Sequence, residues 1–168
     1  VDATVGAGGH AAGILEASQP EGSLLGMDVD PQALALASRR LSVFGDRVTL
    51  VKASYGTLRE QLDRLGWKSV DGILLDLGVS SMQIDTPERG FSFLSDGPLD
   101  MRFDPEQPFS ADDLVNRWGE QELADVIWRY GEDPLSRRIA RAICQARPLT
   151  TTLELAGVVL KAAGGRKG

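Results

Sequence analysis

The chain opens with Val1-Asp2-Ala3-Thr4-Val5-Gly6-Ala7-Gly8-Gly9-His10, and this stretch decides the fold. Its first five residues have the pattern of the end of a buried strand, so we expect the natural amino terminus to lie further upstream. The glycines that follow allow a tight turn and a close approach of the backbone to a ligand. Such a turn between a strand and a helix is typical of the ligand-binding end of a parallel α/β sheet.

The segments beyond this turn alternate between strands and helices. Short apolar runs over residues 23–28, 48–51 and 70–76 predict three further buried strands. Helical patterns separate them, and Asp30-Pro31 begins one helix with an N-cap and a proline at the first helical position. Near-continuous apolar strands joined by helices predict a parallel sheet covered on both faces.

The pattern changes after the fourth predicted strand. Residues 77–108 have no sustained period and are rich in Gly, Pro, Ser and Asp, which is typical of a functional or disordered loop. Residues 109–168 are helical throughout, with Ser110 as one N-cap and Thr151-Thr152-Leu153-Glu154 as a capping box. We therefore predict a front α/β part over 1–108, including the long active-site loop 77–108, and a helical module over 109–168.

Composition excludes several classes of protein. The hydrophobic share of 42% suffices for a core, yet no apolar run reaches the roughly 20 residues that span a bilayer. The single cysteine, Cys144, excludes an internal disulfide framework and a CxxC zinc site. We expect a reducing, cytoplasmic compartment, with no membrane and no metal.

Charge is distributed unevenly along the chain. The net charge of -6 argues against a general nucleic-acid binder, but residues 131–168 hold seven bases and three acids, whereas residues 1–130 hold 11 bases and 21 acids. A basic end on an acidic body permits a surface that faces RNA, and a solvated arginine-rich helix face is the alternative. We expect the aromatic side chains here to belong to the core of the helical module rather than to stack on RNA. The bases are Arg137, Arg138, Arg141, Arg147, Lys161, Arg166 and Lys167, and the aromatic residues are Trp118, Trp128 and Tyr130.

Asp28 is the first candidate ligand of a cofactor. It ends the second strand about 20 residues after the glycine turn, where a carboxylate can take both hydroxyls of a ribose. The spacing Gly6-x-Gly8-Gly9 lacks the third glycine of the dinucleotide fingerprint, and Asp2 precedes the turn where methyltransferases of this fold often carry an acid. Both observations favour S-adenosylmethionine over NAD. An NAD(P)-dependent oxidoreductase and a non-catalytic RNA-binding module stay open as alternatives.

Asp76 ends the fourth strand, where this architecture places its reacting group. An exocyclic amine of a base such as cytosine is a poor nucleophile, and a hydrogen-bond acceptor would align its lone pair with a methyl group. Asp76 with Ser80 or Ser81 could supply acceptors, and a strand-end cap is the alternative for Asp76. Four apolar side chains of the long loop either wall a pocket for a flipped base or pin the loop to the sheet: Phe91, Phe93, Met101 and Phe103.

Long and unusual strings of residues add a resemblance to a known family. Over its whole length the chain resembles the 16S ribosomal RNA (cytosine-N4) methyltransferases. The matching strings are Val1-Asp2-Ala3-Thr4 with Gly8-Gly9-His10, Asp71-Gly72-Ile73-Leu74-Leu75-Asp76-Leu77-Gly78-Val79-Ser80-Ser81, Glu88-Arg89-Gly90-Phe91-Ser92-Phe93, Asp96-Gly97-Pro98-Leu99-Asp100-Met101-Arg102 and Tyr130-Gly131-Glu132.

The resemblance implies a Rossmann-like S-adenosylmethionine-dependent methyltransferase sheet, incomplete in this chain, with an inserted helical domain for substrate recognition. It implies N4-methylation of a cytidine of 16S ribosomal RNA in the decoding region of the small ribosomal subunit. The family continues with further strands, so we expect the chain to be part of a longer enzyme. Carried over residue by residue, the implied cofactor contacts are Gly8, Gly9, His10, Asp28, Tyr55, Asp76 and Gln83.

Overall fold

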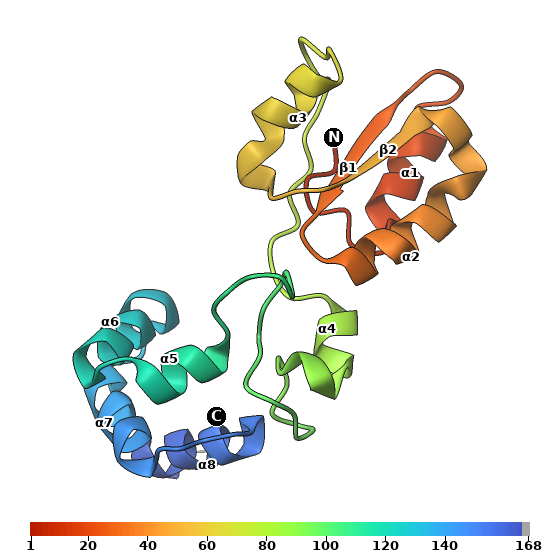
Figure 1. Cartoon of the computed structure of the whole chain (residues 1–168). Coiled ribbons are helices and arrows are strands. Elements are labelled where there is room, and N and C mark those ends of the chain that lie inside the picture. Colours follow the sequence, from red (N-terminus) through yellow and green to blue (C-terminus); the bar gives the residue numbers. More distant parts are fainter. Residues whose placement is uncertain (166–168) are drawn as a thin grey trace. The chain divides into compact units, whose positions relative to one another are not determined.

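The structure is a computed structural model that describes residues 1–165 and divides into two compact units (Figure 1). The first unit comprises Val1–Gly78 and Phe103–Pro105, and the second comprises Val79–Arg102 and the described chain from Glu106 onward. Each unit is described by itself below. Arg166 and Lys167, which the sequence assigns to the basic end, lie outside the described residues.

The first unit contains a small parallel sheet. Strands β1 (Leu24–Asp28) and β2 (Val48–Lys52) pair in parallel along their whole length. Asp2 forms parallel bridges to Gly26 of β1 on one side and to Leu74 on the other. The order is therefore β2, β1, the first segment and the segment around Leu74, and all neighbours are parallel, as the strand–helix alternation predicts. The fourth strand, predicted over 70–76, is confirmed only as a bridge at Leu74.

Three helices cover this sheet. Helices α1 (Gly9–Ala17) and α2 (Pro31–Leu41) pack on one side of the strands, and α3 (Leu58–Arg64) lies on the other (Figure 1). Asp30 caps α2 as predicted, because its Oδ1 accepts a hydrogen bond from the Gln32 amide at 2.9 Å. Two 3₁₀ turns, Ser42–Arg47 and Tyr55–Thr57, flank β2. The buried core consists of Val5, Ala11, Leu15, Leu24, Ala37 and Leu41.

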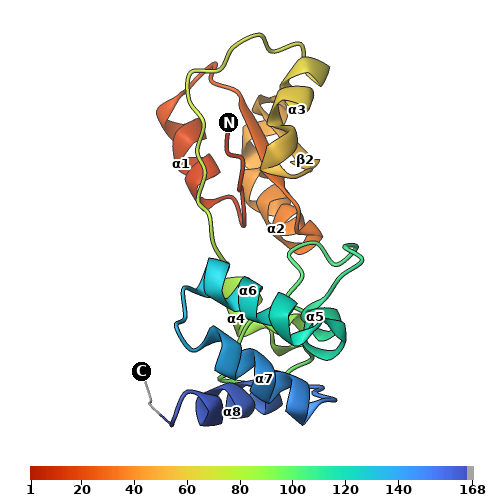
Figure 2. The same ribbon diagram turned by 90° about the vertical axis from the view of Figure 1, so that its left-hand side faces the viewer.

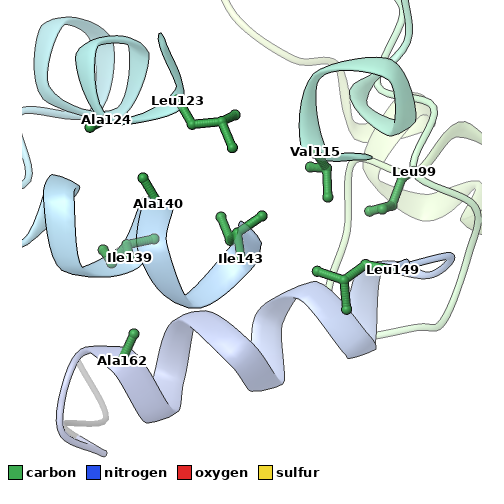
Figure 3. Close-up of a cluster of buried hydrophobic side chains, with 9 residues drawn as sticks. All are labelled: Leu99, Val115, Leu123, Ala124, Ile139, Ala140, Ile143, Leu149 and Ala162. Carbon is green, nitrogen blue, oxygen red and sulfur yellow. The ribbon is translucent and has the colours of Figure 1, made fainter. Parts of the chain in front are cut away.

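The second unit is helical. Helices α6, α7 and α8 pack in succession (Figure 2), and the predicted caps at Ser110 and Thr151 are both present as capping boxes. Its buried core draws on every one of the last four helices (Figure 3). Within the described chain, no helix is long and apolar enough to cross a membrane. The helices are α4 (Ser81–Asp85), the 3₁₀ turn Pro87–Arg89, α5 (Ala111–Arg117), α6 (Glu120–Gly131), α7 (Ser136–Ala146) and α8 (Thr152–Ala162).

The long loop differs from its predicted assignment. The sequence groups 77–108 with the sheet, whereas the compact units place most of it with the helices. Leu99 is buried in the helical core, and its carbonyl accepts a hydrogen bond from the Asp112 amide. Of this loop, only Leu77, Gly78 and Phe103–Pro105 belong to the first unit, where Asp104 lies 3.1 Å from the Lys52 ammonium group. Contacts between distant residues hold this loop, so local periodicity could not reveal its partner.

Two aromatic residues are also placed differently from the prediction. Trp118 packs against the helical core, as expected. Trp128 and Tyr130 lie in the last turns of α6 and are 57% and 82% exposed. The prediction that both belong to the core is therefore wrong. The residues of α6 that are buried in the core are Leu123 and Ala124.

Candidate cofactor site at the carboxyl ends of the strands

The glycine turn forms the centre of the site. Gly8 is buried with φ +82°, and a Cβ atom there would lie 3.2 Å from Cγ of Leu41 in α2. Its amide donates to the Val5 carbonyl at 2.8 Å, which closes the turn. Helix α1 begins at once with Gly9, and no side chain caps it. The first-turn amides of α1 are therefore available to a ligand that offers hydrogen-bond acceptors.

Asp28 ties this turn to the end of β1. One carboxylate oxygen accepts from the Gly6 amide at 2.9 Å, and the other accepts from the Asp30 amide at 2.9 Å. Asp28 thus supports the loop. Each oxygen still has a second lone pair, and the side chain is half-buried rather than enclosed. The carboxylate can therefore support the turn and accept from a ribose at the same time.

Asp2 lies on the other side of the turn and is only 1% exposed. Its Oδ1 accepts from the Thr4 amide at 3.3 Å, whereas its Oδ2 has no hydrogen-bond partner among the described residues. Burial raises the pKa of this carboxyl group. An unpartnered buried carboxylate is unfavourable, and a cationic or hydrogen-bond-donating ligand would offset that cost.

Asp76 and His10 meet at the same edge of the sheet. The Asp76 amide donates to the Thr4 hydroxyl at 2.7 Å, which holds the residue beside the turn. His10 Nδ1 lies 3.9 Å from Asp76 Oδ2, and these side chains are 65% and 68% exposed. At this distance and exposure the pair is weak and screened by water. Both groups remain open to a ligand.

Tyr55 completes the set in the first unit. It follows β2 by three residues, and the Ala53 amide donates to the Asp28 carbonyl at 3.0 Å, which keeps the ends of β1 and β2 together. Ser54 caps the short turn in which Tyr55 lies, and about half of the Tyr55 side chain is exposed. The structure thus brings the predicted residues Gly8, Gly9, His10, Asp28, Tyr55 and Asp76 to the carboxyl ends of one sheet.

Ser80, Ser81 and Gln83 belong to the second unit. The Ser80 hydroxyl accepts from the Gln83 amide at 3.2 Å, and Gln83 Oε1 accepts from the Ser80 amide at 3.0 Å. This capping box begins α4, buries Gln83 and leaves Ser81 exposed at the first helical position. The Ser-x-x-Gln spacing is a known signal for such a box, although the sequence analysis assigned these residues to chemistry alone.

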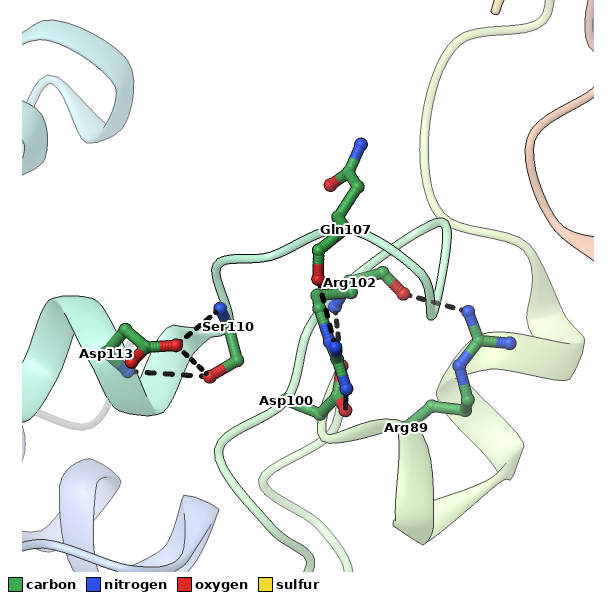
Figure 4. A network of polar contacts seen from close by, with 6 residues as sticks. All are labelled: Arg89, Asp100, Arg102, Gln107, Ser110 and Asp113. Carbon is green, nitrogen blue, oxygen red and sulfur yellow. Dashed lines mark hydrogen bonds and ion pairs between the residues drawn. The ribbon is translucent and has the colours of Figure 1, made fainter. Parts of the chain in front are cut away.

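The long loop holds a polar network that sequence analysis missed (Figure 4). The Arg102 guanidinium donates to both carboxylate oxygens of Asp100, at 2.9 and 2.7 Å, and holds the pKa of that carboxyl group below its usual range. The third Arg102 nitrogen, Nη1, donates to the Gln107 carbonyl, and Arg89 donates to the Arg102 carbonyl. The network fixes the loop in one conformation next to α5.

These features define the class of the protein. Parallel strands, a glycine turn before an uncapped helix and a carboxylate after the next strand form a Rossmann-like α/β unit with a nucleotide-type ligand site. Residues 1–167 match the MraW methylase family, and the chain belongs to this family.

Similar proteins agree with this assignment. The chain is 55% identical over 168 residues to "Ribosomal RNA small subunit methyltransferase H" of Dehalococcoides mccartyi, covering 100% of the chain and 48% of that protein. It is 56% identical to the protein of the same name from Syntrophus aciditrophicus, covering 98% of the chain and 53% of that protein. The chain thus spans about half the length of these curated relatives. The resemblance stated from the sequence is confirmed at the level of the family.

Proposed function

We propose that this chain forms the cofactor-binding front part of an S-adenosylmethionine-dependent methyltransferase that modifies N4 of a cytidine in 16S ribosomal RNA. The observation that carries the proposal is the glycine turn, tied to Asp28 at the end of β1 and leading into an uncapped α1. The names of the relatives support ribosomal RNA of the small subunit as the substrate. We place the reaction in the decoding region and the enzyme in the cytoplasm, as the resemblance implies.

The residues present fit this cofactor. S-adenosylmethionine carries an ammonium group and a sulfonium group, and the buried, unpartnered Oδ2 of Asp2 suits a cationic ligand. Asp28 would hold the ribose hydroxyls, while the amides of Gly9 and His10 would face the rest of the molecule beside the tight turn at Gly8. Tyr55 offers an aromatic face at the same edge, and Gln83 is a further contact carried over from the family. The bound cofactor would supply the methyl group.

Asp76 would orient the amine that receives the methyl group. The amine lone pair of cytosine is delocalised into the ring, so alignment matters more than deprotonation. The Asp76 carboxylate would accept an amine hydrogen, turn the lone pair outward and offset the positive charge that develops on nitrogen. The product then loses a proton to water. Ser80 and Ser81 are proposed as additional acceptors, and the capping role of Ser80 does not exclude this because a hydroxyl has two lone pairs.

Calorimetric titration tests the cofactor assignment. We expect the chain to bind S-adenosylmethionine and not NAD. Asp28→Ala should weaken binding at least tenfold, because a hydrogen bond to a charged group contributes about 1.5–3 kcal/mol. Asp46→Ala removes an exposed acid from the turn before β2 and serves as the matched control. Equal affinity of the parent chain and Asp28→Ala would contradict the assignment.

A further inference from the structure

The end of the α6–α7 pair carries an unusual combination of side chains. Trp128 and Tyr130 lie in the last turns of α6, and both are largely exposed. Arg129 lies between them and is exposed as well. Two exposed aromatic rings with an arginine between them supply the two kinds of group that hold single-stranded nucleic acid. Residues 132–135 then lead into α7, which packs along α6.

The first turn of α7 adds two cations to the same end. Arg137 and Arg138 are exposed, and neither they nor Arg129 form an ion pair within residues 1–165. Three other arginines, in α5, in α7 and just after α7, are engaged. Arg117 lies 3.0 Å from Asp113, Arg141 lies 3.2 Å from Glu120, and Arg147 donates to the carbonyls of Val115 and Trp118.

We propose that this α6–α7 tip, defined by Trp128, Arg129, Tyr130, Arg137 and Arg138, binds an unpaired stretch of RNA. The proposal deepens the proposed function and rests on it. Bases stack on exposed aromatic side chains, and arginines bind the phosphates between them. The two aromatic residues are two positions apart on a helix, so their side chains point to different sides and each takes its own base.

Charge decides between RNA and a protein partner. The chain has a net charge of -6, so a polyanion meets repulsion over most of its surface. Two acids, Glu132 and Asp133, also lie in the connection between α6 and α7. The Asp133 carboxylate, however, accepts a hydrogen bond from the Leu135 amide at the start of α7. The tip differs from the rest of this acidic chain, because three of its arginines form no ion pair among the described residues and lie beside two aromatic groups. This local combination favours phosphates and bases as the groups that bind there.

Binding of a fluorescently labelled eight-nucleotide single-stranded RNA rich in cytidine tests the aromatic part. The protein is the whole 168-residue chain. Trp128→Ala and Tyr130→Ala should each weaken binding about fivefold or more, since stacking of one base contributes that much or more. Trp128→Phe should keep most of the affinity. Leu153→Ala removes an exposed apolar side chain from α8 and should have no effect. A duplex of the same length, whose bases are already stacked, should not distinguish the variants.

Salt dependence tests the arginines. The double variant Arg137→Ala/Arg138→Ala should lower the slope of log affinity against log salt by about 1.4, because each phosphate contact to a single strand contributes roughly 0.7. Arg117→Ala is the matched control, because Arg117 is already paired with Asp113. Its slope should equal that of the parent chain.

Two results would overturn the proposal that the tip binds RNA. One is absence of RNA binding by the parent chain, and the other is unchanged RNA affinity in both Trp128→Ala and Tyr130→Ala, which would assign the aromatic residues to a protein partner. S-adenosylmethionine titration of every variant separates this inference from the function on which it rests. If cofactor binding is normal and the tip variants bind RNA as the parent chain does, only the proposal for the tip is rejected. RNA binding through the tip without cofactor binding sinks only the methyltransferase proposal.

Discussion

At the residue scale, Asp2 has the least favourable surroundings of the candidate site. Its carboxyl group is buried beneath the glycine turn, and one oxygen has no partner in the described chain. Burial raises its pKa above the ordinary value near 3.8. The folded chain therefore takes up this proton more readily than the unfolded chain. The contribution of Asp2 to stability is fully present below the ordinary pKa and is lost as the pH rises through the raised one.

Asp2→Asn tests this pH dependence. The amide keeps an acceptor for the Thr4 N–H and does not titrate. We expect the variant to gain stability relative to the parent as the pH rises from about 4 towards neutrality, because only the parent must ionise a buried acid. Urea unfolding followed by the amide resonances of β1 measures the difference. A difference that stays constant across this pH range would contradict the assignment of the buried charge.

Two glycines of the same region give opposite expectations. Gly8 has φ +82° and close neighbours, whereas Gly13 lies inside α1 with nothing within 4 Å of an added Cβ. Gly8→Ala should destabilise the first unit by about 1–2 kcal/mol through left-handed strain, with further loss from contact with Leu41. Gly13→Ala should stabilise it by about 0.5–1 kcal/mol. Denaturant midpoints compare the two, and equal effects would contradict the tight turn.

The features that the sequence predicts best are those in which a residue type has a single structural role. The glycine turn was predictable because few other residues allow a left-handed backbone, and the Asp30 cap was predictable because few side chains can accept from a first-turn amide. The capping box of Gln83 lies within a loop that has no helical period, and α4 is only five residues long, so the periodicity of the sequence does not indicate this helix. The unpartnered oxygen of Asp2 depends on burial by neighbouring strands, which no local pattern contains.

At the element scale, each unit uses an arginine to close the end of a helix. Arg47 donates to the carbonyl of Leu15 at 2.7 Å near the end of α1, and Arg147 donates to the carbonyls of Val115 and Trp118 at the end of α5. These carbonyls have no partner inside their helices. Arg147 is one of the bases from which the sequence predicts a surface that could face RNA. In the structure its guanidinium instead makes this capping contact.

Arg147→Met keeps most of the apolar stem and removes the donors. We expect it to destabilise the second unit by about 1–3 kcal/mol, because two carbonyls lose a charged partner. Thermal unfolding monitored by circular dichroism measures the loss. Arg138→Met, on the exposed face of α7, is the control and should stay within about 0.5 kcal/mol of the parent. Equal stability of both variants would contradict the cap.

At the scale of the whole molecule, the fold of the first unit was predictable and the boundary of the second was not. Strands near 24–28 and 48–52 and the helices between them follow from local periodicity, because each element buries its own apolar side chains. The long loop over residues 77–108 has no such period. It is held by Leu99, by hydrogen bonds between Gly97 and Thr152 in both directions, and by the Asp100–Arg102 pair. Its partners lie up to 57 residues away along the chain, beyond the reach of a local pattern.

Leu99→Ala tests to which unit the long loop belongs. Leu99 is 2% exposed within the helical core, so its truncation should destabilise the second unit by about 2–5 kcal/mol. Leu94→Ala, at an exposed position of the same loop, is the matched control and should be neutral. Hydrogen exchange provides the measurement: protection should fall in α5 to α8 and stay unchanged in β1 and β2, because global protection follows the stability of the unit in which an amide lies. Loss of protection in the strands instead would assign the loop to the sheet, as the sequence alone predicted.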